Sequence, residues 1–216
     1  MKTMLEKIQT CFRCLLLLVT LAAVALPAPI RADRSDLPLA VRVVISKAGA
    51  LVKQQKYDQA VAVLTAYQGR SQGTPIGRAS DPNGYDHPEL YFALGTCHLL
   101  NQAYGPAAEA FEQAVRRDPG HVKAWLNLAK AAYELNDYAR AARCFRQAYD
   151  QEAAKKPEYL YYSAVAFLMA SRTEPCLDAF ELLFKTHGEA VQPAWRENYV
   201  SALLTAGRSR QALPDV

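Results

Sequence analysis

The apolar positions of this 216-residue chain recur with the spacing of amphipathic α-helices that come in pairs. Between residues 91 and 98, and again between 107 and 114, apolar or small residues return every three or four positions and so share one helical face. A short turn around Asn101 separates the two segments. Pro106 stands in the first turn of the second segment, and the sequence Asp118-Pro119-Gly120 ends it. The pattern predicts two antiparallel helices joined by a tight turn.

The whole pattern is repeated 34 residues further along the chain. The segment 91–114 returns as 125–148, with Leu94 matched by Leu128 and Phe111 matched by Phe145. A fixed period of this length is the signature of a stacked repeat architecture. One helical hairpin cannot bury its apolar face alone, so each hairpin must pack on the next, and an all-α solenoid is expected.

These units resemble the tetratricopeptide repeat (TPR) family. The resemblance is carried by Trp125, Leu128, Ala129, Tyr133, Tyr138, Ala141, Phe145 and Ala148, and by their partners one repeat earlier. Looser copies lie on both sides. The resemblance implies an all-α fold, a right-handed solenoid of antiparallel helix hairpins over residues 33–216. About five units are expected, at residues 41–67, 88–121, 122–156, 157–188 and 193–213.

The chain departs from this regular pattern in two places. Residues 68–86 are longer than the repeat needs and rich in Gly, Ser, Pro and Asn, which predicts a surface loop. Asp86 and Glu89 then read as a capping box that restarts a helix, with Pro88 in its first turn. At the other end the fifth unit is cut short at Pro214, and no polar helix follows to cap the stack.

Residues 1–32 are predicted to be an export signal. Lys2, Lys7 and Arg13 make its start positive, and the uncharged apolar run of 12 residues from 15 to 26 is shorter than the roughly 20 that span a membrane. Cleavage is expected after Ala32. An uncleaved anchor is the alternative, because the apolar stretch between Arg13 and Arg31 can be counted as 17 residues. Either way we expect a periplasmic or secreted protein, or one anchored facing the periplasm, with membrane contact only through this segment.

The net charge of +4 belongs mostly to this first segment. Four of the 25 basic residues and one of the 21 acidic residues lie in residues 1–32, so the remaining chain has a net charge of +1. A nucleic-acid-binding protein would carry a basic stripe, and none is expected here.

Three of the five cysteines lie beyond residue 32, namely Cys97, Cys144 and Cys176. All three fall in predicted helices at places where small residues pack, and an odd number cannot fully pair. We expect buried free thiols rather than a disulfide. Cys11 and Cys14 have the spacing of a redox or metal pair, but they lie in the predicted export signal.

No catalytic or metal-binding motif stands out, so an enzyme is not expected and no cofactor or metal is predicted. His98 lies on the packed face of a helix, whereas His87, His121 and His187 lie near helix ends and read as capping or solvated residues. The histidines do not have the spacing of metal ligands.

The resemblance implies a concave groove lined by the first helix of each hairpin, on the face turned away from the second. An apolar groove suits an amphipathic helix or an extended apolar segment, although packing against neighbouring helices is the alternative reading of this lining. Only Asn127 could match the clamp by which some TPR proteins hold a terminal carboxylate. The predicted groove residues are Phe92, Thr96, Leu99 and Leu100, then Lys123, Leu126, Asn127, Lys130 and Tyr133, and finally Tyr161, Tyr162, Val165, Leu168 and Met169.

Three functions remain open on the sequence alone. The first is an exported, non-enzymatic TPR adaptor that binds a protein segment in a cell-envelope assembly or transport complex. The second is a structural subunit that self-assembles through its uncapped last repeat. The third is a cell-wall glycan binder, with Tyr161, Tyr162 and Trp195 as candidate aromatic faces.

Overall fold

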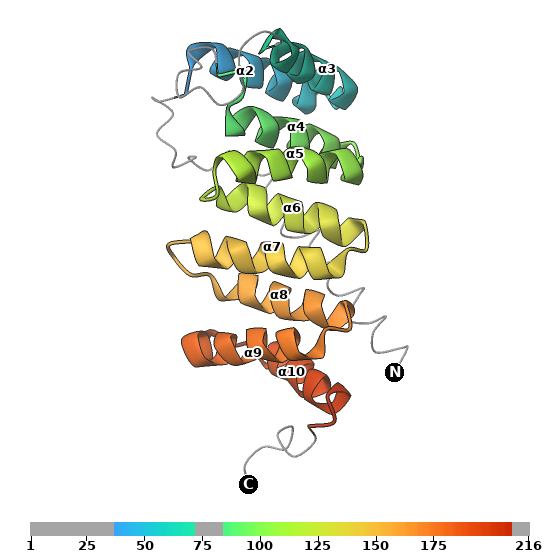
Figure 1. Ribbon diagram of the computed structural model, residues 1–216, viewed down its shortest axis with the longest axis vertical. Helices are drawn as coiled ribbons and strands as arrows, with labels where there is room; N and C mark the ends of the chain where they lie inside the picture. The colour runs from blue at the N-terminus through green and yellow to red at the C-terminus, as the bar shows by residue number, and fades with distance from the viewer. Residues whose placement is uncertain (1–36, 72–83, 209–216) are drawn as a thin grey trace.

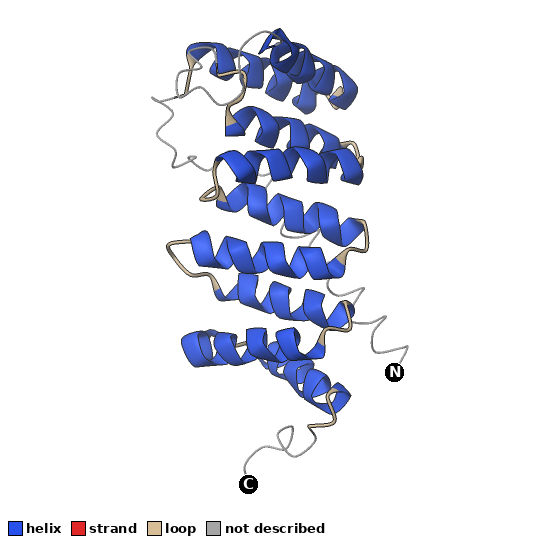
Figure 2. Cartoon of the chain, viewed as in Figure 1, coloured by secondary structure: helices blue, strands red, loops and turns tan. Residues whose placement is uncertain are grey.

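The computed structural model describes residues 37–71 and 84–208 (Figure 1). The export-signal prediction, most of the predicted surface loop and the second helix of the fifth unit lie outside these residues. The described residues form α-helices and two short 3₁₀ turns and contain no strand, so the predicted all-α class is confirmed (Figure 2). The elements are α2 (Leu39–Lys53), α3 (Tyr57–Gln68), η1 (Gly69–Ser71), α4 (Pro88–Leu100), α5 (Tyr104–Arg117), α6 (Val122–Glu134), α7 (Tyr138–Gln151), α8 (Pro157–Met169), α9 (Thr173–His187), η2 (Gly188–Ala190) and α10 (Pro193–Thr205).

Each helix packs chiefly on the helices next to it in sequence, which gives an elongated stack from α2 at one end to α10 at the other (Figure 1). The hairpins are α2–α3, α4–α5, α6–α7 and α8–α9, and α10 begins a fifth. This is the predicted solenoid. Because contacts run between neighbours in sequence, its stability is close to a sum over units and their junctions.

One turn geometry is used at the end of every first helix. A residue there has left-handed backbone geometry, with φ between 55° and 71°. The N–H of the following residue donates to a carbonyl five positions back, as from Lys56 to Leu51 at 3.0 Å and from Arg208 to Leu203 at 2.9 Å. These bonds satisfy the carbonyls that the helix end leaves open, in a Schellman-type turn. The left-handed residues are Gln55, Gln102, Asn136, Ser171 and Gly207.

Gly95 lets α4 and α5 approach closely. A Cβ atom on Gly95 would lie 2.7 Å from Cε1 and 2.8 Å from Cδ1 of Phe111, a ring that is fully buried. Alanine occupies the equivalent place in the other hairpins, at Ala48, Ala129 and Ala164. The Phe111 ring therefore packs so close to α4 that even the Cβ atom of an alanine at position 95 would be too near it.

The buried side chains form two groups that meet at α4. Leu90 and Cys97 belong to the group built from α2 and α3, whereas Phe92 and Leu99 pack against the group that runs from α5 to α10. α4 therefore has apolar residues on more than one face. Helix α4 joins the first hairpin to the rest of the stack.

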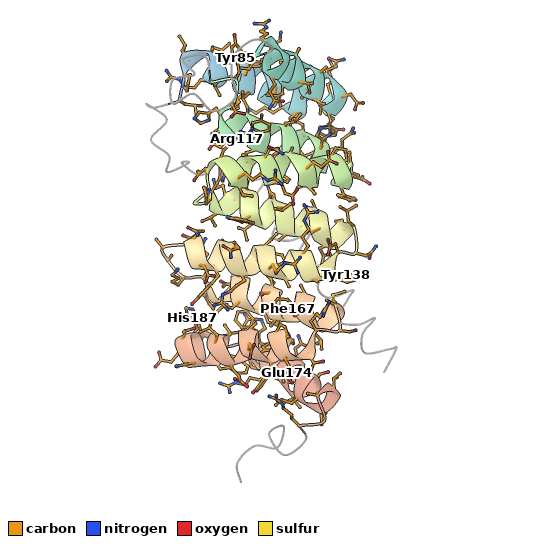
Figure 3. The ribbon with its side chains drawn as sticks, in the orientation of Figure 1. Tyr85, Arg117, Tyr138, Phe167, Glu174 and His187 are labelled. Atoms are coloured by element: carbon orange, nitrogen blue, oxygen red, sulfur yellow. The ribbon has the colours of Figure 1, made fainter. Side chains whose placement is uncertain are left out.

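The start of α4 differs from the predicted capping box. His87 is the N-cap, and its Nδ1 accepts a hydrogen bond from the backbone N–H of Glu89 at 3.2 Å, while Pro88 occupies the first turn as predicted. Asp86 lies one residue too early to cap the helix. Its carboxylate instead accepts hydrogen bonds from Arg117, a residue labelled in Figure 3. The Arg117 guanidinium also lies 4.0 Å from the centre of the Tyr91 ring. Asp86 thus fastens the segment before α4 to the end of α5.

Four of the five exposed large apolar side chains among the described residues lie at the two ends of the stack, and the fifth, Leu135, lies in its middle. Leu39 and Val43 are 69% and 60% exposed on α2, and Leu204 is 58% exposed on α10, where Val200 is also open to solvent. In the part of the chain that the structure describes, no helix has both the length and the apolar character needed to cross a membrane.

Candidate functional site

The first helices of the second and third hairpins leave a partly open surface, which we call the α4–α6 surface. α4 contributes Phe92, Thr96 and Leu99, all half-buried. The Phe92 ring lies 5.9 Å from the Phe111 ring and 4.7 Å from the His121 ring, measured between centres. The hydroxyl of Thr96 donates to the Phe92 carbonyl at 2.8 Å. These contacts position the Phe92 ring and the Thr96 side chain on α4. From α6 the surface includes Lys123, Leu126, Asn127 and Lys130.

The α6 part of this surface carries its polar groups. Lys123 is exposed, whereas Leu126, Asn127 and Lys130 are half-buried. Burial lowers the pKa of Lys130, and the nearby carboxylate of Glu134 partly offsets that effect. Among the described residues, the Lys130 ammonium forms no ion pair and the Asn127 side chain no hydrogen bond. A partly desolvated ammonium ion and a free amide therefore lie beside an apolar patch.

Most of the groove residues predicted on α8 are buried in the structure. Tyr161, Tyr162, Val165 and Leu168 are buried, and only Met169 of the predicted α8 set is half-buried. Tyr133 of α6 is also buried, with its hydroxyl 3.5 Å from the Met169 sulfur. These buried residues pack between helices, which is the alternative to a groove lining given above. No ligand or partner is present to test the groove prediction itself.

Helices α10 and α7 cover the two α8 tyrosines. The Trp195 ring stacks on the Tyr161 ring, with centres 4.7 Å apart and planes 12° apart, and Asn198 donates to the Tyr161 hydroxyl at 2.8 Å. Tyr162 packs on Phe145 of α7 at 5.4 Å between ring centres. The aromatic faces considered for glycan binding therefore stack on one another in the core. In this arrangement they leave little surface on which a sugar ring could lie.

Glu89 and His121 lie beside this surface, although the sequence pattern predicts them only as residues at helix ends. The His121 Nε2 atom lies 3.3 Å from a Glu89 carboxylate oxygen, and both side chains are largely buried. Burial raises the pKa of Glu89, but the close contact with His121 and the nearby positive charge lower this pKa by more, so the net shift is downward. The repeat could have identified Glu89, because it stands 34 residues before the groove residue Lys123.

The histidines and cysteines have structural surroundings. His121 caps α6 by accepting from the Ala124 N–H at 3.2 Å, so capping by His87 and His121 is confirmed. His187 lies 3.0 Å from the Tyr149 hydroxyl. Cys97, Cys144 and Cys176 are buried and free, as predicted, and burial raises the pKa of Cys97 to about 11 and those of Cys144 and Cys176 to about 12. No group of three or more potential metal ligands occurs within the described ranges.

Stacked helical hairpins with a partly open first-helix surface define a repeat scaffold of the kind used for protein interaction. Two family models, both described as tetratricopeptide repeat, match residues 47–122 and 98–164. Together they span more than half of the chain, which therefore contains tetratricopeptide repeats. No match was found among curated proteins.

Solved structures of low sequence identity share the fold. A crystal structure of MamA has a TM-score of 0.59 at 13% identity and covers 80% of this chain and 86% of that chain. A structure of MamA from Desulfovibrio magneticus RS-1, from residue 41 to its end, has a TM-score of 0.56 at 12% identity. The match covers 81% of this chain and 89% of that chain. A structure of nearly identical TPR-like repeats, described as those of a kinesin light chain from Podospora anserina, has a TM-score of 0.55 at 14% identity. The match covers 82% of this chain and 92% of that chain. At these identities the similarity concerns the fold alone.

Proposed function

We propose that this chain is an exported, non-enzymatic TPR adaptor that holds a segment of another protein on its α4–α6 surface, within a cell-envelope assembly or transport complex. The export part of the proposal rests on the positive start and short apolar run of residues 1–32. It is tested by sequencing the N-terminus of the protein purified from its host, which should begin at Asp33. A protein that retains Met1 and stays in the cytoplasm would contradict it.

The observation that carries the binding proposal is the combination of groups on α6. Leu126 offers apolar area, and within one helical turn Asn127 and Lys130 offer donors that no described residue uses. A half-buried ammonium has lost part of its hydration, so an acceptor from a partner would restore favourable interactions. The surface fits an extended or helical segment with apolar side chains and a carboxylate or carbonyl oxygen placed over Lys130.

Reversing the charge of Lys130 should weaken capture of this segment. A hydrogen bond to a charged group is worth about 1.5–3 kcal/mol. The affinity of the Lys130→Glu variant for the partner segment should therefore fall by at least about tenfold. The measurement uses a photo-crosslinking residue at position 127, introduced in the native host, and quantifies the crosslinked partner peptide with and without Lys130→Glu.

The control variant is Lys185→Glu, the same charge change at an exposed position on α9. It should leave crosslinking from position 127 unchanged. A crosslinker at Asp178, which is also exposed on α9, should not capture the same peptide. Equal capture from positions 127 and 178, or capture that Lys130→Glu leaves intact, would show that the α4–α6 surface is not the binding site.

A second function, self-assembly, is favoured by the apolar ends of the stack. Of the five exposed large apolar residues in the described ranges, Leu39 and Val43 lie on α2, and Val200 and Leu204 lie on α10. An end-to-end contact between copies would cover both pairs. Because the two ends are different surfaces, such a contact would build rings or open chains.

Self-assembly predicts that sedimentation velocity shows larger species as the protein concentration rises. The double variant Val200→Glu with Leu204→Glu should then remain a monomer, because burying two carboxylates at the junction is unfavourable. Leu135→Glu is the control, since Leu135 is also exposed but lies in the middle of the stack. A wild-type protein that stays monomeric at every concentration excludes this function.

A further inference from the structure

A hollow of about 640 Å³ opens between the second helices of two consecutive hairpins, α5 and α7, and reaches down to α6. It uses a different face of α6 from the α4–α6 surface. Its volume is within the range of about 300–1,000 Å³ that is usual for ligand sites. The hollow is lined by Glu112, Val115 and Arg116 of α5, Trp125 and Leu128 of α6, and Arg140, Arg143, Cys144 and Gln147 of α7.

The floor of the hollow is apolar and fixed in position. Val115, Leu128 and Cys144 are buried, and Trp125 is half-buried. The indole N–H of Trp125 donates to the Pro119 carbonyl at 2.8 Å, so the polar edge of the ring is already satisfied. The remaining ring surface is available for apolar contact, and tryptophan is a residue type on which binding energy concentrates.

The rim of the hollow is basic. Arg140 is paired with Glu112 at 2.5 Å, a contact that bridges α7 and α5. Arg116 and Arg143 are exposed, and neither has an ion pair with a described residue. Three guanidinium groups and one carboxylate thus surround a single site, although the chain beyond residue 32 carries a net charge of only +1. The two unpaired arginines can each bind a carboxylate with paired N–H donors.

The next junction along the stack has a larger side chain at the equivalent position. Residue 149, which stands 34 positions after Val115, is a tyrosine. Its buried side chain lies between α7 and α9, with the hydroxyl 3.0 Å from His187 Nε2 and the two rings edge to face at 5.8 Å. A valine at position 115 therefore leaves open a place that a tyrosine occupies one repeat later.

We propose that this hollow is a second binding site, which takes an acidic protein segment that places one aromatic or large aliphatic side chain over Trp125. Carboxylates beside that side chain pair with Arg116 and Arg143, while the apolar side chain covers the floor. The combination favours a peptide over a polyanion such as a nucleic acid. A polyanion requires an extended basic track, whereas here two unpaired arginines flank an apolar floor.

The test uses fluorescence anisotropy with short labelled peptides. The probe is Glu-Asp-Glu-Phe-Glu-Asp-Glu, with two comparison peptides in which the phenylalanine is replaced by glycine or the acidic residues by lysine and arginine. The acidic phenylalanine peptide should bind most tightly, and added salt should weaken its binding. The double variant Arg116→Ala with Arg143→Ala should bind this probe at least about tenfold more weakly, because both charged contacts are lost.

A second variant separates binding from folding. Val115→Tyr copies the residue found at the next junction and should fill the hollow, so it should lose binding while circular dichroism shows the same helix content. The control Arg42→Ala with Lys47→Ala removes two exposed charges from α2 and should bind the probe like the wild type. Lys130→Glu should also bind it normally, which separates this site from the α4–α6 surface.

Three results would overturn the proposal. The first is an acidic phenylalanine peptide that binds no better than the glycine or basic peptide. The second is a Val115→Tyr variant that binds as well as the wild type. The third is a heparin oligosaccharide that binds more tightly than the peptide and depends on the same arginines, because the site would then recognise polyanions.

Discussion

Replacing Gly95 with leucine is expected to destabilise the protein by about 1–3 kcal/mol, and more if the helices cannot move apart. Even the first atom of a new side chain would lie 2.7 Å from the Phe111 ring. That ring is fully buried, and its centre lies 5.9 Å from the centre of the Phe92 ring, so moving it aside would disturb the packing around it. The expected result is a lower midpoint of guanidinium unfolding, followed by circular dichroism at 222 nm.

The matched control is the same substitution at Gly49. Gly49 lies inside α2 and is exposed, and a Cβ atom placed on it would meet no atom within 4 Å. Leucine is a better helix former than glycine, by up to about 1 kcal/mol, so Gly49→Leu should leave stability unchanged or raise it. If both variants lost stability equally, the effect would come from leucine itself and not from the approach of α4 to α5.

The fold follows from the sequence because each unit encodes the same local solution. Periodic apolar positions define the two helices, and Gly95 or alanine at the equivalent place allows them to approach. The turn geometry is less visible, because the left-handed position is held by Gln55, Gln102, Asn136, Ser171 and Gly207, which share no single residue type. Only asparagine and glycine favour that geometry by themselves, so at the other turns the helix packing imposes it.

The candidate site was harder to predict than the fold. The sequence pattern indicates which residues share a helical face, but it does not indicate which other side chains cover that face. The spacing of Tyr161 and Tyr162 correctly places them in α8, yet their burial depends on Trp195 of α10 and Phe145 of α7. The hollow depends in the same way on side chains from three helices. Its sequence signal is one small residue, Val115, where the next repeat has Tyr149. That signal becomes meaningful only when the neighbouring helices are in place.

The double variant Tyr162→Ala with Leu168→Ala is expected to unfold the last part of the stack. Truncating one large buried aromatic residue typically costs about 3–5 kcal/mol, and truncating a buried leucine about 2–5 kcal/mol. The two losses need not add, because both residues belong to α8 and its packing. In a repeat stack each unit depends on its neighbours, so α8, α9 and α10 should unfold at lower guanidinium concentration than α4 to α7. Guanidinium unfolding followed by circular dichroism should then show two transitions for the double variant and fewer for the wild type.

Leu204→Ala is the control for this prediction, because Leu204 lies in the same part of the stack but is 58% exposed. Truncating it should change stability by no more than about 0.5 kcal/mol. The double variant also decides between the two readings of α8. If its unfolding curve matched that of the wild type while partner capture fell, Tyr162 and Leu168 would be accessible binding residues, and the groove would extend onto α8. Loss of the last units instead means that Tyr162 and Leu168 are packing residues of the stack, so the binding surface ends near Lys130 and Met169.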